Sequence, residues 1–123
     1  MRVVITGASR GIGRATALKL ASDGAEAMTL CDVAYLDELE ELATSLRTSG
    51  CKVRTLKADM AKPTEPAKVI AAAVKAMGGI DALVGNAGIT APSKLVDLDL
   101  ATWNRVFDTH ISGLRVNKIG HFK

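Results

Sequence analysis

The segment that most constrains the fold of this chain is the glycine-rich stretch at residues 6–13, which reads TGASRGIG. It follows the apolar run at residues 3–5 and precedes a segment with helical periodicity, so it predicts a strand, a tight turn and a helix in that order. Gly7 can turn the chain sharply because it has no Cβ. Gly11 and Gly13 leave room for a pyrophosphate beside the helix N-terminus, where free N–H groups and the helix dipole favour an anion. The segment therefore predicts a nucleotide phosphate site.

The spacing of these glycines, Gly-x3-Gly-x-Gly, narrows the class of nucleotide-binding loop. It differs from the Gly-x-Gly-x-x-Gly of the common dinucleotide fingerprint. No Gly-Lys-Ser/Thr follows, which excludes a P-loop because that loop needs its lysine for phosphate. Taken alone, the segment also fits an ordinary glycine-rich turn between a strand and a helix. The choice depends on residues further along the chain.

An acidic residue stands at the position where a dinucleotide site needs one. Residues 26–31 predict a second strand, and Asp32 follows it about 20 positions beyond the glycines, where a carboxylate accepts hydrogen bonds from the adenosine ribose. The alternative interpretation is that Asp32 caps the next helix, which is expected to begin near Tyr35. We prefer the ribose role because both the spacing and the local structure fit it.

Helical and extended segments alternate along the chain. Apolar residues recur at helical spacing in three segments, each followed by glycine, which commonly ends a helix. These are Ile12, Ala15 and Leu18; Leu36, Leu39, Leu42, Ala43 and Leu46; and Val69, Ile70, Ala73, Val74 and Met77, followed by Gly24, Gly50, and Gly78 with Gly79. Because strands lie between them, we expect a doubly wound parallel α/β sheet of Rossmann type, incomplete, with about four strands in the order 3-2-1-4. Its fourth strand would form an exposed edge.

Together these motifs resemble the short-chain dehydrogenase/reductase family, over residues 2 to about 113. The loop at residues 6–13 matches the family's cofactor loop, and Ala58, Asp59 and Met60 resemble the segment that holds the adenine. Residues 79–88, GIDALVGNAG, resemble the fourth strand and its Asn-Asn-Ala-Gly turn, with Gly85 in place of the first asparagine. The resemblance implies an NAD(P)-binding domain at residues 1–113, followed by an atypical basic tail at 114–123.

The resemblance also implies which residues bind the cofactor. They are Gly7, Ser9, Arg10, Gly11, Ile12, Gly13, Asp32, Asp59, Met60, Asn86, Ala87 and Gly88. For the cofactor itself we expect NAD rather than NADP, because a carboxylate at Asp32 would lie near the 2′-phosphate of NADP. Unit charges about 4 Å apart repel by about 4 kcal/mol at an effective dielectric constant near 20. Arg10 would offset part of this repulsion.

The family's catalytic residues have no counterpart in this sequence. The family uses a serine and a Tyr-x-x-x-Lys motif, in which the lysine lowers the pKa of the tyrosine so that it can exchange a proton with the substrate. Here the single tyrosine is Tyr35, and the residue four positions later is Leu39. His110 stands where the family has a helix asparagine that helps to hold a proton relay. We identify no catalytic residue, and a substitution at His110 without catalytic consequence is equally compatible with the sequence.

Three functional interpretations follow. The first is an NAD(P)-dependent oxidoreductase that transfers hydride between alcohols and ketones, present here as a truncated or frame-shifted form. The second is a non-catalytic module that binds a dinucleotide or dimerises. The third is a degenerate product without function. We prefer the first, because charge and helical pattern both change after Gly113.

Composition restricts the partners. The sequence holds 16 Lys and Arg against 13 Asp and Glu, and the surplus of three equals the three cations of the tail, Arg115, Lys118 and Lys123. A neutral body lacks the basic face that nucleic acid requires. No apolar run is long enough to span a membrane, and Cys31 and Cys51 are interpreted as packing residues of a cytoplasmic protein without a metal site. We expect a small alcohol or carbonyl substrate and a homo-oligomer.

One further helix is expected near the end of the sequence. Its apolar stripe comprises Leu100, Trp103, Phe107, Ile111 and Leu114. The stripe is expected to pack on the sheet or near a subunit contact, with Trp103 and Phe107 interpreted as core residues.

Overall fold

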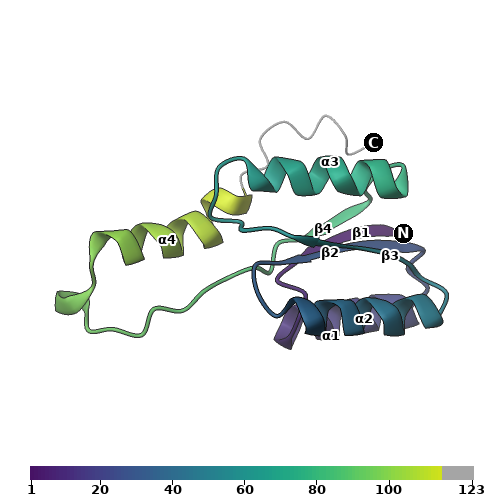
Figure 1. The fold of residues 1–123 in the computed structure, drawn as a ribbon, viewed down its shortest axis with the longest axis horizontal. Helices are drawn as coiled ribbons and strands as arrows, with labels where there is room; N and C mark the ends of the chain where they lie inside the picture. The colour runs from purple at the N-terminus through teal and green to yellow at the C-terminus, as the bar shows by residue number, and fades with distance from the viewer. Residues whose placement is uncertain (115–123) are drawn as a thin grey trace.

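The computed structural model describes residues 1–114 and contains a single parallel sheet of four strands (Figure 1). The strands are β1 (Arg2–Thr6), β2 (Ala27–Asp32), β3 (Lys52–Lys57) and β4 (Ala82–Val84), in the order β3-β2-β1-β4. β1 pairs with β2 from Arg2 opposite Ala27 to Thr6 opposite Cys31, and with β4 through Val3 opposite Ala82. This confirms the predicted strand order and leaves β4 at one edge of the sheet.

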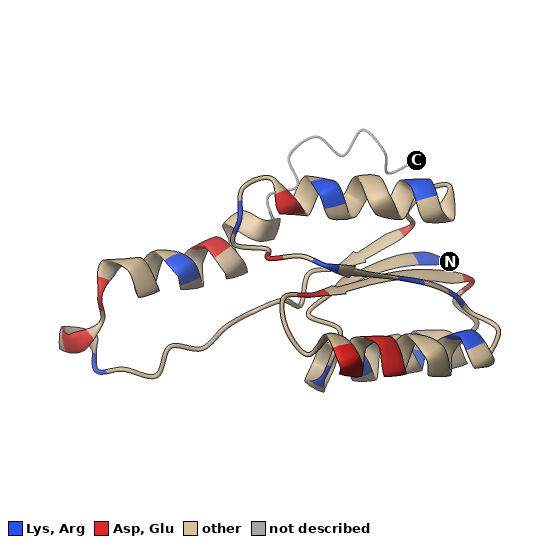
Figure 2. Ribbon diagram, in the orientation of Figure 1, with Lys and Arg blue, Asp and Glu red and all other residues tan. Residues whose placement is uncertain are grey.

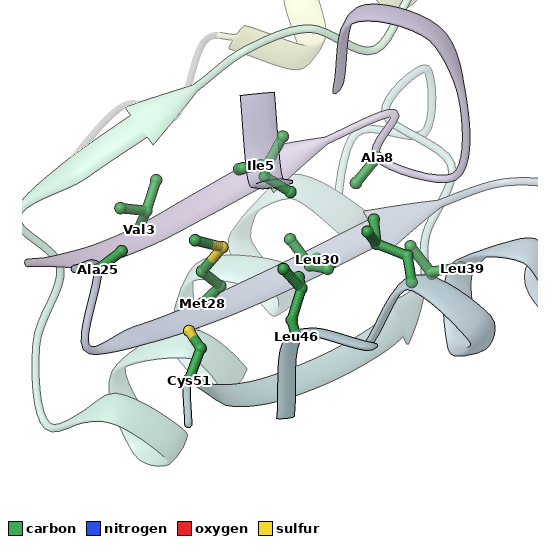
Figure 3. Packing of buried hydrophobic residues seen from close by; sticks show 11 residues of the cluster. Val3, Ile5, Ala8, Ala25, Met28, Leu30, Leu39, Leu46 and Cys51 are labelled. Carbon is green, nitrogen blue, oxygen red and sulfur yellow. The ribbon is translucent and has the colours of Figure 1, made fainter. Parts of the chain in front are cut away.

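Helices cover both faces of the sheet. Figure 1 shows α1 (Gly11–Ser22) and α2 (Leu36–Thr48) on one side, and α3 (Glu65–Met77) on the other. Because successive side chains of a strand point to opposite faces, Val3 and Ile5 belong to the core under α1 and α2, whereas Val4 belongs to the core under α3. In Figure 3, Leu30 of β2 lies close to Leu39 of α2 within the first of these clusters.

The predicted face of α3 is confirmed, and that of α2 is confirmed except at Leu36, which is 38% exposed at the start of the helix. Leu39, Leu42, Ala43 and Leu46 are buried on α2, as are Val69, Ile70 and Ala73 on α3. α3 has a proline, Pro66, in its first turn and is followed by Gly78, whose φ of 74° is the left-handed conformation that closes many helices. Figure 2 shows acidic residues at the start of α2 and α3 and basic residues toward their ends, which complements the helix dipole.

The predicted face of α1 is wrong. Ile12 is 77% exposed and Leu18 is 42% exposed, whereas the buried positions of this helix are Gly13 and Ala17. The reason is close packing: a Cβ on Gly13 would collide with the carbonyl oxygen of Gly7, so the helix approaches the end of β1 through its smallest residues. The glycine loop, rather than hydrophobicity, decides which side of α1 faces the sheet.

The last helix, α4 (Leu100–His110), extends beyond the sheet rather than packing on it (Figure 1). Trp103 and Phe107 stack on each other with ring centroids 5.0 Å apart, but they are 44% and 48% exposed, so their interpretation as core residues is wrong. Two short 3-10 helices, at Leu95–Asp97 and Ser112–Leu114, flank α4.

Two further expectations concern the tail at residues 114–123 and the possibility of a membrane-spanning helix. Of the predicted basic tail, only Leu114 lies within the described residues, and the domain boundary at residue 113 stays a prediction. Within residues 1–114, every helix is too short or too polar to cross a lipid bilayer.

Candidate cofactor-binding site

A hollow of about 420 Å³ lies where the strands end, and most of the residues predicted to bind the cofactor line it. Those residues are Gly7, Arg10, Gly11, Asp32, Asp59, Met60, Asn86, Ala87 and Gly88. The strand order reverses between β1 and β4, and in open α/β sheets ligands bind at the carboxyl ends of the strands at such a reversal. Residues distant in sequence therefore meet at the position where the fold expects a ligand.

The glycine loop forms one wall of the hollow. Gly7 has a φ of 66°, and a Cβ there would lie 2.9 Å from the Cα of Ala87. Arg10 precedes the first turn of α1 in an extended conformation, with no side-chain cap and no acidic residue in that turn. No side chain of the described residues caps the first N–H groups of α1, so these donors are available to an anion.

Asn86 and Thr6 fasten this loop to the turn after β4. The side-chain amide of Asn86 donates to the carbonyl oxygens of Gly7 at 2.9 Å and Thr6 at 3.2 Å. The hydroxyl of Thr6 accepts hydrogen bonds from the backbone N–H groups of Asn86 at 3.1 Å and Ala87 at 3.0 Å. Asn86 thus holds the loop in shape. The role of Thr6 was missed, although it is the first residue of the glycine motif.

Asp32 ends β2 and lies in the hollow, but its carboxylate already has two partners. One oxygen accepts from the N–H of Ser9 at 3.1 Å and the other from the N–H of Val33 at 2.8 Å. The alternative role of Asp32 as a helix cap is not realised, because α2 begins after Tyr35 without any side-chain cap. Asp32 therefore joins β2 to the glycine loop while facing the candidate site.

The side chains of the other loop residues take different positions. Ser9 is buried, and its hydroxyl donates to the carbonyl oxygen of Ala34 at 3.2 Å. Arg10 lies over the ring of Tyr35, with its guanidinium carbon 3.9 Å from the ring centroid. Ile12 is exposed and does not line the hollow. Tyr35 was missed as a site residue, because nothing in the sequence pairs it with Arg10.

Asp59, which follows β3 in the sequence, also lines the hollow. One of its oxygens accepts from the N–H of Ala61 at 3.0 Å, and the other lies 3.4 Å from Nη1 of Arg105 on α4. The backbone N–H of Asp59 donates to Glu65 at 2.6 Å. Sequence reasoning missed Arg105, which is 46 positions away from Asp59 and joins α4 to the site.

His110 contacts the turn after β4. Its Nε2 lies 3.1 Å from the backbone nitrogen of Ile89 and 2.9 Å from the carbonyl oxygen of the same residue. The ring lies directly against Gly88, where a Cβ would come within 2.5 Å of the imidazole. The structure therefore gives His110 a contact that holds the turn, and the absent side chain of Gly88 leaves the space for it.

The Cys31 thiol at the hollow is not activated, and the described residues hold no group of metal ligands. Burial raises the pKa of the Cys31 thiol to about 12, so this thiol stays protonated at neutral pH although it borders the hollow. Within residues 1–114 there is no group of three or more His, Cys, Asp or Glu side chains that could hold a metal ion. The site is a binding surface of backbone donors, carboxylates and arginines, which fits the phosphates and ribose of a nucleotide.

Comparisons with known proteins agree with this geometry. A family model described as short chain dehydrogenase matches residues 1–116. The chain is 38% identical over 112 residues to cis-4-hydroxycyclohexanecarboxylate dehydrogenase of Sinomonas cyclohexanicum, covering 90% of this chain and 44% of that protein.

Two solved structures are similar throughout the described fold. A short chain dehydrogenase from Burkholderia cenocepacia in complex with NADP has a TM-score of 0.89 at 30% identity. The match covers 92% of this chain and 46% of the Burkholderia cenocepacia chain. A short chain dehydrogenase/reductase from Burkholderia phymatum in complex with NAD has a TM-score of 0.85 at 33% identity. The match covers 92% of this chain and 40% of the Burkholderia phymatum chain.

The chain thus spans less than half of the length of each of these relatives. The match nevertheless includes all four strands and the glycine loop, because it covers about nine-tenths of this chain. On this evidence, the chain belongs to the short-chain dehydrogenase family.

Proposed function

We propose that this chain binds NAD(H) in the hollow at the ends of the strands, and that it forms the cofactor-binding part of an oxidoreductase acting on a small alcohol or carbonyl compound. The observation that carries the proposal is the fastening of the glycine loop by Asn86 and Thr6, beside a first turn of α1 that has no side-chain cap. Bound nicotinamide supplies hydride chemistry, which no side chain of this sequence provides.

Each part of the nucleotide has a proposed partner. The N–H groups of Gly11, Ile12 and Gly13 at the start of α1 would hold the pyrophosphate, because nothing in the described structure caps them from a side chain. Asp32 would accept from the ribose hydroxyls through its remaining lone pairs. Asp59 and the N–H of Met60 would hold the adenine, as the family resemblance implies.

The oxidoreductase reaction also needs a proton donor or acceptor at the substrate oxygen. Tyr35 is the single tyrosine, and Leu39 stands four positions after it, so the Tyr-x-x-x-Lys of the family is not among these 123 residues. The proposed role of this sequence is therefore to bind and orient the cofactor, and the proton-transfer step is not assigned to any residue in it.

For the cofactor we propose a preference for NAD over NADP. A 2′-phosphate on the ribose would lie near the carboxylate of Asp32, and like charges at close range repel. Removing that carboxylate removes the repulsion, so Asp32→Ala is expected to improve NADPH binding while weakening NADH binding, because the ribose loses an acceptor.

The test is isothermal titration of the 123-residue chain with NADH and NADPH, for the wild type and for Asp32→Ala. Asp37→Ala is the matched control, because Asp37 is an exposed residue in the first turn of the neighbouring helix α2. We expect tighter binding of NADH by the wild type and a reversed or abolished preference in Asp32→Ala only. Wild-type preference for NADPH would contradict the assignment, and failure to bind either nucleotide would contradict the cofactor site.

A second candidate function, a dimerising or non-catalytic dinucleotide-binding module, is favoured by the exposed apolar stripe on α4. Leu100, Trp103 and Phe107 of α4 and Ile111 directly after it are all exposed in the single chain, and clusters of this kind usually mark contacts with another protein. We propose a second copy of this chain as the partner and the cytoplasm as the location, since both cysteines are free thiols. Light scattering after size exclusion tests the assembly: a monomer at all concentrations argues against it.

A further inference from the structure

Tyr35 has an unusual conformation for its residue type. It has a φ of 55°, and it is the one non-glycine residue with positive φ among residues 1–114. This left-handed conformation disfavours bulky side chains, whereas asparagine and glycine accept it readily. Such outliers often accompany a functional role when the surrounding structure maintains them. Here Tyr35 is 46% exposed and lines the hollow.

The contact that Tyr35 makes is with Arg10 of the glycine loop. The guanidinium carbon lies 3.9 Å from the ring centroid, which is within the range of a cation–π interaction. A guanidinium that rests on a ring by its face keeps its N–H donors directed outward in its own plane. No carboxylate in the described part of the chain pairs with Arg10. Tyr35 therefore restrains Arg10 without using its hydrogen-bond donors.

Asp32 and Arg10 line the same hollow with opposite charges. Both oxygens of Asp32 accept backbone hydrogen bonds, from Ser9 and Val33, and such bonds compensate part of the negative charge. A phosphate on the ribose 2′-hydroxyl would therefore meet a partly compensated carboxylate and a restrained guanidinium with available donors. Arginine forks bind phosphate in a bidentate manner when they are held in position.

We propose that Tyr35 is a positioning residue for cofactor selectivity: by holding Arg10, it gives the site affinity for a ribose 2′-phosphate in spite of Asp32. Tyr35 then limits how strongly the site prefers NAD over NADP. This inference rests on the proposed function, because it requires the adenosine end of the cofactor to lie in the hollow. It does not depend on the substrate or on proton transfer.

The test uses two probes that differ only in the 2′-phosphate, 5′-AMP and adenosine 2′,5′-bisphosphate, titrated into the 123-residue chain by calorimetry. The variants are Tyr35→Asn, which removes the ring but tolerates the left-handed conformation, and Tyr35→Phe, which keeps the ring. We expect Tyr35→Asn to weaken bisphosphate binding about five-fold, the factor that corresponds to one exposed cation–π contact, and to change 5′-AMP binding by less than about two-fold. Tyr35→Phe should resemble the wild type.

A double-mutant cycle separates positioning from general structural support. If Tyr35 acts through Arg10, then Tyr35→Asn added to Arg10→Met should produce no further change in the affinity for the bisphosphate. Should Tyr35→Asn lack a cooperative thermal transition, Tyr35→Gly takes its place, because glycine is relaxed in this conformation.

The outcomes discriminate between the two proposals. Equal weakening of both probes, or unchanged binding of both, would overturn the role of Tyr35 while leaving the nucleotide site intact. If the folded wild type bound neither probe, the proposed cofactor site itself would fail. A lower ratio of bisphosphate to 5′-AMP affinity in Tyr35→Asn, absent in the Arg10→Met background, would support the inference.

Discussion

Asn86 donates a hydrogen bond from its side-chain amide to the carbonyl oxygen of Gly7 across 2.9 Å, and so ties the turn after β4 to the glycine loop after β1. The two segments pack so closely that a Cβ on Gly7 would lie 3.0 Å from the same amide nitrogen. The loop proposed to hold the pyrophosphate therefore owes its shape to a residue 79 positions away.

Replacing Asn86 with alanine should weaken both the fold and the site. Two loop carbonyls lose their donor, and leaving partly buried groups unpaired lowers the free energy of unfolding by about 1–3 kcal/mol. We expect NADH affinity to fall as well, because the loop is no longer held open. Urea unfolding and calorimetric titration measure the two effects. Asn104→Ala, on the exposed side of α4, is the control, and an equal loss there would contradict the argument.

Gly13→Ala should displace the glycine loop. The added methyl group would collide with the carbonyl oxygen of Gly7 and lie 2.7 Å from the Asn86 amide, and such overpacking destabilises by about 1–3 kcal/mol. NADH affinity should fall more than ten-fold, because the displaced N–H groups no longer face the phosphates. Gly24→Ala is the comparison: its Cβ meets open space at a φ of 91°, so it should lower stability but leave nucleotide affinity unchanged.

Stability at low pH should depend on Asp81. The Arg2 side chain donates two hydrogen bonds to this carboxylate, at 2.7 and 3.1 Å, and thereby lowers the pKa of Asp81 well below its usual range. A folded-state pKa below the unfolded value of about 3.9 means that the stabilisation is complete above about pH 5 and is lost as the pH falls through 4 and below. The melting temperature of Asp81→Asn should therefore fall less between pH 7 and pH 3 than that of the wild type. Asp97→Asn should retain the wild-type slope.

The contact of His110 with Ile89 predicts that replacing the histidine with asparagine does not lower stability. One ring nitrogen faces both an N–H donor and a carbonyl acceptor, and it can satisfy only one of them at a time. An asparagine amide offers both a donor and an acceptor, so His110→Asn should be as stable as the wild type or up to about 1 kcal/mol more stable. His110→Leu should lower stability and accelerate hydrogen exchange of the Ile89 amide. Unchanged exchange in His110→Leu would show that the contact does not hold the turn.

Much of the fold follows from local pattern. Strands followed by helices and glycines permit few arrangements other than a parallel sheet, and the confirmed order β3-β2-β1-β4 is one of them. The positions of Asp32 and Asn86 at strand ends also follow, because the carboxyl ends of parallel strands share one edge of the sheet. Their hydrogen-bond partners do not follow, since they depend on the exact approach of separate loops.

The sequence-based predictions that are wrong have a common cause: contacts between elements distant in sequence decide which side chains are buried. Hydrophobicity places Ile12 on the buried side of α1, but the close approach of Gly13 to the glycine loop turns Ile12 outward. The helical pattern predicts Trp103 and Phe107 in the core, but both are exposed because α4 extends beyond the sheet. Tyr35 and Arg105 acquire their places only when α2 and α4 are positioned, so no local signal identified them.

The distance in sequence between Thr6 and Asn86 has a consequence for folding. Their hydrogen bond closes a separation of 80 residues, so the nucleotide loop cannot reach its final shape until the turn after β4 is available. Contacts of such high sequence separation form late, since loop-closure entropy must first be overcome by other contacts. During synthesis, the N-terminal βα unit would therefore emerge first with an unfinished phosphate loop. Nucleotide binding would report the moment at which β4 docks beside β1.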